Sequence, residues 1–333
     1  MSDPPIVGIT MGDPAGIGSE VIAKAYPDLV ERAQIVVIGD EEVVRAARNV
    51  VGTELDIQSV ADIEKAQFRP DAIPVLDLEN VAELEFGVLR EEYGRASLAY
   101  IERAIELAKA GEIDAITTAP INKQATQLAG SKHSGHTGML AEHTGTDNYS
   151  MILIEGDLRV SHVSTHVPLR EACDLVTEEA VLDTIRVTDE ALLRLGVSEP
   201  RIAVVGLNPH ASDGGLLGDE ETAAIGPAVE RARKEGIKVF GPESPDTIYV
   251  RAADGAADCV VSMYHDQGHI PIKMLGFSRG DVVSGVNVTA GLPIVRTSVD
   301  HGTAFDIAGE GIASPQSLVD AVEVAVQMVQ AGD

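Results

Sequence analysis

The stretch PIVGITMGDPAGIGSE, residues 5–20, contains the local pattern that predicts the fold of the whole chain. Its apolar run at 5–10 predicts a buried strand, the glycines that follow predict a tight turn, and a helix is expected from about Ser19. The same alternation continues along the chain, with a helix expected at 94–110 and a strand at 115–118. It predicts an α/β fold with largely parallel sheets that helices cover on both faces.

Length and composition predict two folded domains. At 333 residues, with 44% hydrophobic residues spread throughout, the chain can bury a large core. Because no long linker interrupts the alternation, we expect the chain to cross between domains near residues 128 and 290. Residues 1–128 together with 291–333 would form the first domain, and residues 129–290 the second.

The chain is strongly acidic, with 25 Lys and Arg residues against 53 Asp and Glu residues and a net charge of −28. Such a field repels nucleic acid and anionic membranes, so neither is an expected partner. We interpret the excess as adaptation to a halophilic environment, where salt screens the repulsion; a well-solvated acidic surface is the simpler alternative. With no signal-like segment, no membrane-length apolar run and only two cysteines, the predicted location is the cytoplasm.

Three histidines, His166, His210 and His265, each stand beside proline or glycine just after an apolar run. Open α/β sheets bind ligands beyond the carboxyl ends of their strands. Three imidazoles at such an edge suit a divalent metal with an open position for substrate, although three unrelated loop histidines remain the alternative. The apolar runs are residues 158–163, 202–205 and 259–263.

Other stretches are candidates for holding an anion. The glycine-rich turn at 12–18 precedes a helix, where backbone N–H groups can face a phosphate, but it is neither GxGxxG nor a P-loop. In a second turn, Thr137 is a candidate helix cap and His136 a candidate anion contact. Lysines and arginines are scarce, so Lys123, Lys273 and Arg296 inside apolar segments are candidates to bind phosphate or carboxylate.

The glycine-rich stretch at 298–313 resembles the adenine-nucleotide loop of the isocitrate and isopropylmalate dehydrogenases, and residues 12–20 resemble an N-terminal turn of those enzymes. A broader resemblance, over nearly the whole chain, is to the 4-hydroxythreonine-4-phosphate dehydrogenase family. The motifs that carry it are GDPAGIG (12–18), GHTGMLAE (135–142), THVPLRE (165–171), GLNPHASDGG (206–215), GPESPDT (241–247), MYHDQGHIPIK (263–273) and GLPIVRTSVDHGTA (291–304).

This resemblance implies a two-domain α/β/α enzyme of the isocitrate dehydrogenase type, with its active site in the interdomain cleft. The first domain would bind NAD or NADP, and the second would hold one divalent ion (Zn²⁺, Co²⁺, Mn²⁺, Ni²⁺ or Mg²⁺) and the dimer contacts. A homodimer with shared active sites is implied. The residues implied are His166, His210 and His265 for the metal; His136, Thr137, Lys273, Asn287 and Arg296 for the substrate; and Gly12, Asp13, Gly16, Gly18, His301, Gly302, Thr303 and Asp306 for the nucleotide.

The implied reaction oxidises the C3 hydroxyl of a small 4-phosphorylated four-carbon acid, and the β-keto acid then loses CO₂. Lys273 is the candidate acid–base residue or phosphate contact, and Asp246 a candidate to orient a ligand. Residues 117–123 and 268–271 resemble the branch that acts on 4-phospho-D-threonate and 4-phospho-D-erythronate more than the vitamin B6 branch that acts on 4-phosphohydroxy-L-threonine.

Other functions remain open at this point. A relative that dehydrogenates a cyclic diol carboxylate would share the same motifs. A hydrolase or aldolase could use the three histidines without a nucleotide, and a non-catalytic binding protein would need no turnover. The identity of the metal and the choice between NAD and NADP are also open.

Overall fold

The computed structural model describes residues 4–133, 135–278 and 285–332, which form two compact units. The first unit comprises the described residues up to Gly145 together with Leu292–Ala331, and the second is Thr146–Gly291. Both are α/β with largely parallel sheets, so the predicted fold class is confirmed. No helix in the described part of the chain is long and apolar enough to cross a membrane.

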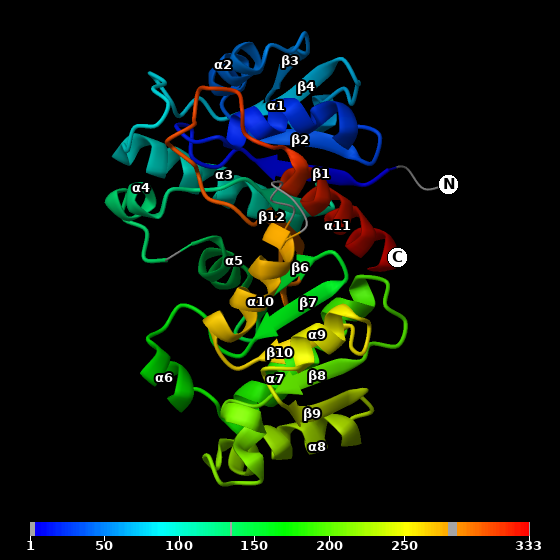
Figure 1. Ribbon diagram of the computed structural model, residues 1–333. Coiled ribbons are helices and arrows are strands. Elements are labelled where there is room, and N and C mark those ends of the chain that lie inside the picture. Colours follow the sequence, from blue (N-terminus) through cyan, green and yellow to red (C-terminus); the bar gives the residue numbers. More distant parts are fainter. Residues whose placement is uncertain (1–3, 134, 279–284, 333) are drawn as a thin grey trace. The chain divides into compact units, whose positions relative to one another are not determined.

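The first unit is built on six parallel strands in the order β3-β4-β2-β1-β5-β12 (Figure 1). Apart from the edge strand β3, these strands are mostly buried on both faces, as expected where helices cover both faces of a parallel sheet. Strands are β1 (Ile6–Thr10), β2 (Gln34–Gly39), β3 (Asp56–Val60), β4 (Ala72–Asp77), β5 (Ala115–Thr118) and β12 (Val295–Val299); helices are α1 (Gly18–Leu29), α2 (Glu41–Val51), α3 (Glu91–Ala110), α4 (Lys123–Leu128), α5 (His136–Thr144) and α11 (Gln316–Gly332).

The second unit has the strand order β11-β6-β7-β10-β8-β9. Strands β7, β10, β8 and β9 are parallel, whereas β6 is antiparallel to both β7 and β11. Only Gly156 and Asp157 join β6 to β7, and so short a loop cannot make a parallel crossover. Strands are β6 (Ser150–Glu155), β7 (Leu158–His162), β8 (Ile202–Val205), β9 (Val239–Glu243), β10 (Cys259–Ser262) and β11 (Val286–Ala290); helices are α6 (Leu169–Asp174), α7 (Glu178–Arg194), α8 (Gly226–Lys234), α9 (Ile248–Ala253) and α10 (His265–Ser278).

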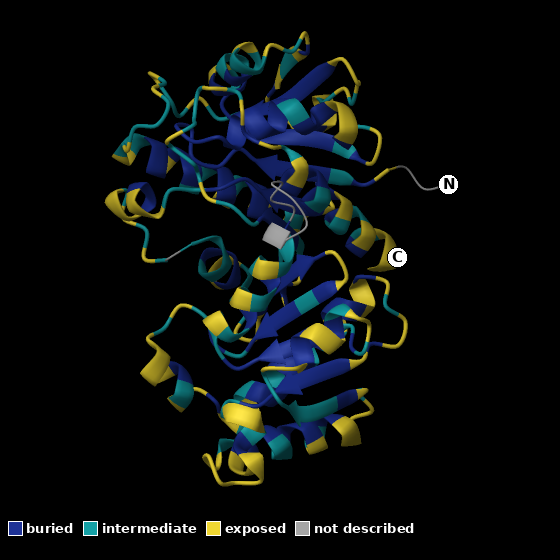
Figure 2. Ribbon diagram, in the orientation of Figure 1, coloured by how far each residue is buried: buried dark blue, intermediate teal, exposed yellow. Residues whose placement is uncertain are grey.

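The division between the units differs from the expected one at its first boundary. We placed the crossing near residue 128, but residues up to Gly145 group with the first unit. The reason is helix α5, whose Met139, Leu140 and Ala141 are buried in the core of that unit. Figure 2 shows most of the inner strands of each unit as buried, whereas the edge strand β9 is of intermediate burial. The second boundary, at 291/292, falls one residue or so from the expected position.

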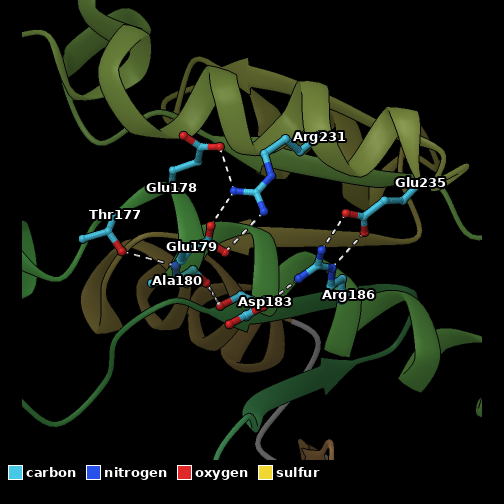
Figure 3. A network of polar contacts seen from close by, with 9 residues as sticks. Thr177, Glu178, Glu179, Ala180, Asp183, Arg186, Arg231 and Glu235 are labelled. Atoms are coloured by element: carbon cyan, nitrogen blue, oxygen red, sulfur yellow. Dashed lines mark hydrogen bonds and ion pairs between the residues drawn. The ribbon is translucent and has the colours of Figure 1, made fainter.

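Arginines join α7 to α8 in the second unit (Figure 3). Arg186 donates two hydrogen bonds to the Glu235 carboxylate, at 2.8 and 2.6 Å. Arg231 donates to Glu178 at 2.9 Å and to Glu179 at 2.5 Å. These exposed pairs place scarce positive charge where acidic side chains crowd, which offsets local repulsion in an acidic chain.

Candidate active-site residues

The three predicted metal ligands follow three neighbouring parallel strands. Strands β7, β10 and β8 lie side by side in that order, so their carboxyl ends meet at one edge of the sheet. His166 lies four residues beyond β7, His265 is the first residue of α10 just after β10, and His210 lies in the 3₁₀ segment Pro209–Asp213 after β8. The strand order therefore brings the segments that carry the three histidines to the same edge of the sheet.

His166 and His265 lie close together. Their ring centroids are 5.7 Å apart, and both rings line a cavity of about 280 Å³ that Thr165 and Tyr264 also line. His210 is largely exposed, with Nδ1 3.6 Å from Oδ2 of Asp246. Among the described residues, the side chains as placed form no group of three or more metal-type donors with the geometry of a metal centre. Metal binding by these histidines therefore stays a prediction.

The donor set itself fits a divalent ion. His265 Nδ1 lies 2.7 Å from Oδ1 of Asp266, so the carboxylate accepts that N–H and leaves Nε2 as the nitrogen that can bind a metal. Asp246 lies on the Nδ1 side of His210 in the same way, though at a longer distance. Asp246, which the sequence predicts to orient a ligand, thus lies beside His210, one of the three predicted metal ligands. A carboxylate behind an imidazole is the usual support of metal-binding histidines.

The segment that carries His210 is strained. Residues His210, Ala211, Ser212 and Asp213 all have positive φ, a conformation that costs non-glycine residues of order 1–3 kcal/mol each. Hydrogen bonds fix the start of this segment: the Asn208 N–H donates to the buried carboxylate of Glu221 at 2.7 Å. Such strain concentrates at functional sites, which supports a functional role for this segment.

Sequence reasoning missed two histidines of the second unit. His162, the last residue of β7, is buried, and its Nε2 lies 3.2 Å from Nδ1 of His269 on α10. The ring of His269 stacks on that of His265, with centroids 3.6 Å apart. Burial, with a smaller contribution from His269, lowers the pKa of His162 to about 3. The signal available in the sequence was the spacing of His265 and His269, four residues apart and thus neighbours on one helix face.

In the first unit, the cations Lys123 and Arg296 act on His136. His136 is the first residue of α5, Lys123 the first of α4, and Arg296 lies in β12. Arg296 is buried and its Nη2 donates to Oγ1 of Thr118 at 2.7 Å. Burial lowers the pKa of His136 well below its usual value, and the cations Arg296 and Lys123 lower it further. Among the described residues, Nε2 of His136 is buried without a hydrogen-bond partner. An anion would satisfy these groups.

The other predicted substrate contacts are placed differently. The sequence predicts Thr137 as the cap of α5, and the structure differs. The helix already begins at His136, with Gly135 at the cap position, so Thr137 lies in the first turn. Lys273 and Asn287 belong to the second unit, on α10 and β11. Lys273 lies eight residues after His265 on the same helix, about 12 Å along its axis. Both side chains are half-buried, and their part in binding stays a prediction.

The two glycine-rich stretches predicted to bind the nucleotide lie against each other in the first unit. The Ile17 N–H donates to the carbonyl oxygen of Thr303 at 3.1 Å, and a Cβ at Gly16 would lie 3.0 Å from that of Thr303. Glu20, buried in α1, accepts hydrogen bonds from the N–H groups of Gly309 and Gly311. Glu20 therefore ties the second stretch to the helix that follows the first.

The residues of the two glycine-rich stretches that are predicted to bind the nucleotide differ in their environments. Asp13 is buried, and its Oδ1 accepts from the Ala15 N–H at 2.9 Å. Burial raises the pKa of Asp13 to about 6, although backbone N–H groups of Ala15 and Asn122 oppose the rise. A Cβ at Gly18 would lie 2.2 Å from the carbonyl oxygen of Met11, so only glycine fits there. Gly12 has φ +77°.

In the second glycine-rich stretch, Asp306 and Gly302 are exposed, and His301 Nδ1 lies 3.0 Å from the Gly302 carbonyl oxygen.

Comparison with known proteins identifies the family of the chain. Residues 31–325 match the family described as pyridoxal phosphate biosynthetic protein PdxA. The chain belongs to the PdxA family. It is 45% identical to a D-threonate 4-phosphate dehydrogenase of Pectobacterium atrosepticum, over 97% of this chain and 99% of that protein. A D-threonate 4-phosphate dehydrogenase of Salmonella typhimurium is also 45% identical, over 97% and 98% of the two chains.

Solved structures of similar proteins have the same fold. A 4-hydroxythreonine-4-phosphate dehydrogenase of Klebsiella pneumoniae is 42% identical and superposes with a TM-score of 0.86, covering 98% of each chain. A terephthalate 1,2-cis-dihydrodiol dehydrogenase of Burkholderia xenovorans is 30% identical with a TM-score of 0.68, covering 97% of this chain and 98% of that one. The resemblance read from the motifs is confirmed at the level of family and fold.

Proposed function

We propose that this protein oxidises D-threonate 4-phosphate, or its C2 epimer D-erythronate 4-phosphate, at C3 with NAD or NADP as oxidant. The observation that carries the proposal is the placement of His166, His210 and His265 at one sheet edge. The relatives named D-threonate 4-phosphate dehydrogenase, 45% identical over almost their full lengths, favour this substrate over the amino analogue 4-phosphohydroxy-L-threonine. Residues 117–123 and 268–271 favour the same branch.

Each group of residues has a stated part in this reaction. A divalent ion held by the three histidines would act as a Lewis acid that lowers the pKa of the substrate's C3 hydroxyl. Lys273, as the neutral amine, would accept the hydroxyl proton, and Asp246 would orient His210. A bound nicotinamide would supply the oxidant that takes up the hydride from C3, and the resulting β-keto acid would lose CO₂ to give a phosphorylated three-carbon ketone. His136, Thr137 and Arg296 bind the phosphate, and Asn287 binds another polar group of the acid.

The nucleotide is proposed to bind the glycine-rich stretches of the first unit. Gly12, Gly16 and Gly18 lie in the turn that leads into α1, and the N-terminus of a helix is a place where backbone N–H groups can face a phosphate. The stretch with His301, Gly302, Thr303 and Asp306 is held beside that turn by Glu20. Asp13 lies within the turn, and its raised pKa is typical of residues at binding sites.

We also propose a homodimer whose active sites are shared, with His136 or a neighbour of one subunit completing the site of the other. Light scattering gives the oligomeric state. Mixing an inactive His136→Ala chain with an inactive His265→Ala chain should restore activity, because a mixed dimer then contains one intact site. A fully active monomer would contradict shared sites.

The activity is tested by the absorbance of reduced nicotinamide with four acids: D-threonate 4-phosphate, D-erythronate 4-phosphate, 4-phosphohydroxy-L-threonine and unphosphorylated D-threonate. NAD and NADP are compared, at low and molar salt. We expect the highest kcat/KM with a phosphorylated 2-hydroxy acid, because a site built for a hydroxyl at C2 leaves a polar group mispaired against an ammonium. Product formation without nicotinamide reduction would instead identify a hydrolase or aldolase.

A further inference from the structure

The cluster of histidines in the second unit extends beyond the three predicted ligands, into the interior of the unit. His162 is 3% exposed at the end of β7, and its own backbone is fixed by Ser150, whose Oγ donates to the His162 carbonyl oxygen at 3.0 Å. Helix α10 packs against β7 and β10 at this point. A Cβ at Gly268 would lie 2.4 Å from Nε2 of His162, so glycine at this helical position allows the close approach.

Hydrogen-bond chemistry fixes the tautomers along this chain of rings. A carbonyl oxygen can only accept, so the nitrogen that faces it must carry the proton. His162 Nδ1 faces the Met151 carbonyl oxygen at 3.4 Å, and His269 Nδ1 faces that of His265 at 3.0 Å. His162 Nε2 is then an unprotonated acceptor, 3.2 Å from the N–H of His269. These three contacts are satisfied by one neutral proton arrangement, in which the His269 Nδ1–H is shared between the His265 carbonyl oxygen and Nε2 of His162.

These contacts restrict the ring of His265. Its ring is held on one face by the ring of His269, at 3.6 Å between centroids and 12° between planes, and on its Nδ1 edge by Asp266. His269 is in turn held by its hydrogen bonds to the His265 carbonyl oxygen and to His162. A ring fixed on a face and an edge loses little further freedom when it binds an ion.

We propose that His162 and His269 are positioning residues that hold the His265 imidazole with Nε2 directed to the divalent metal. This inference rests on the proposed metal site. His162 acts through His269 and does not itself touch metal or substrate. Its replacement should therefore weaken metal binding without removing a ligand, as loss of outer hydrogen-bond partners does, by about 10–100-fold.

The test compares His162→Leu, which fills the space but cannot accept, with His162→Gln, whose amide oxygen can accept from His269 near the position of Nε2. His269→Leu removes both the stacking and the hydrogen bonds. Tyr249→Phe is the matched control, because it removes a buried hydrogen bond of 2.7 Å to Ser262 on β10 without touching a histidine. Co²⁺ affinity is measured by competition with a chromophoric chelator, and the visible Co²⁺ spectrum reports the geometry of the ligands.

We expect His162→Leu and His269→Leu to weaken Co²⁺ binding by about 10–100-fold and to change the Co²⁺ spectrum. His162→Gln should restore most of the affinity, and Tyr249→Phe should bind Co²⁺ like the wild type. Equal affinities for wild type and His162→Leu, or for the Leu and Gln variants, would overturn the positioning role alone. If the wild type itself binds no Co²⁺, both the proposed metal site and the positioning role are refuted. Should His162→Leu not fold, His269→Leu against His269→Gln makes the same comparison at a half-buried position.

Discussion

Replacing Asp13 by Asn should stabilise the protein at neutral pH, because the native site penalises the charge of this carboxyl. Asp13 is 1% exposed, and burial raises its pKa from 3.8 to about 6. A rise of this size makes the ionised form about 3 kcal/mol less favourable in the folded protein than in the unfolded chain. The neutral amide of the Asp13→Asn variant would avoid that cost and could still accept from the Ala15 N–H through its carbonyl oxygen.

The sign of the pH dependence follows from the raised pKa. Below about pH 3 the carboxyl is mostly protonated in both states, and it contributes almost no penalty. Between about pH 4 and pH 6 the unfolded chain ionises first, so the stability that the protonated carboxyl provides is lost as pH rises. The advantage of Asp13→Asn over wild type should therefore be near zero at about pH 3 and reach about 3 kcal/mol, as an upper value, at pH 7.5.

Denaturant unfolding at a series of pH values, in a fixed molar salt concentration, measures this difference. Asp258→Asn serves as the control with the opposite sign. Burial raises the pKa of Asp258, but hydrogen bonds from the side chain and backbone of Arg201 outweigh it and lower the pKa overall. That variant should lose stability at pH 7.5 and approach wild type at low pH. An Asp13→Asn protein no more stable than wild type at pH 7.5 would refute the reasoning.

Three further predictions follow from the site and the charge. Replacing any one of His166, His210 and His265 with Ala should abolish turnover while the circular dichroism spectrum and melting temperature change little, because a catalytic metal site is not needed for folding; full activity in a chelated sample would contradict it. Arg296→Met should reduce kcat/KM for the phosphorylated acid by about 10–100-fold, from the loss of a charge-assisted contact, and leave the slow rate with unphosphorylated D-threonate unchanged. The melting temperature should rise from low to molar KCl, because screening reduces the repulsion of a −28 chain; an unchanged value would argue against adaptation to salt.

Much of the fold could be predicted because its elements carry strong local signals. The strands predicted at 115–118 and 202–205 match β5 and β8, since short apolar runs bounded by polar residues or turns are typical of buried parallel strands. Helix α10 was missed because Gly268 and Pro271 lie inside it, and both residues disfavour a helix interior. Packing against β6, β7 and β10 overrides that local preference.

The sequence by itself determined the family, the alternation of strands and helices, and the three histidines expected at one sheet edge. The order of β7, β10 and β8, which makes that edge a shared one, came only with the tertiary structure. So did the contact between His162 and His269, which are 107 residues apart, and the hydrogen bonds from Gly309 and Gly311 to Glu20. Local propensity depends on neighbours within a few residues, whereas these contacts depend on how the strands are ordered and how closely the helices pack on them.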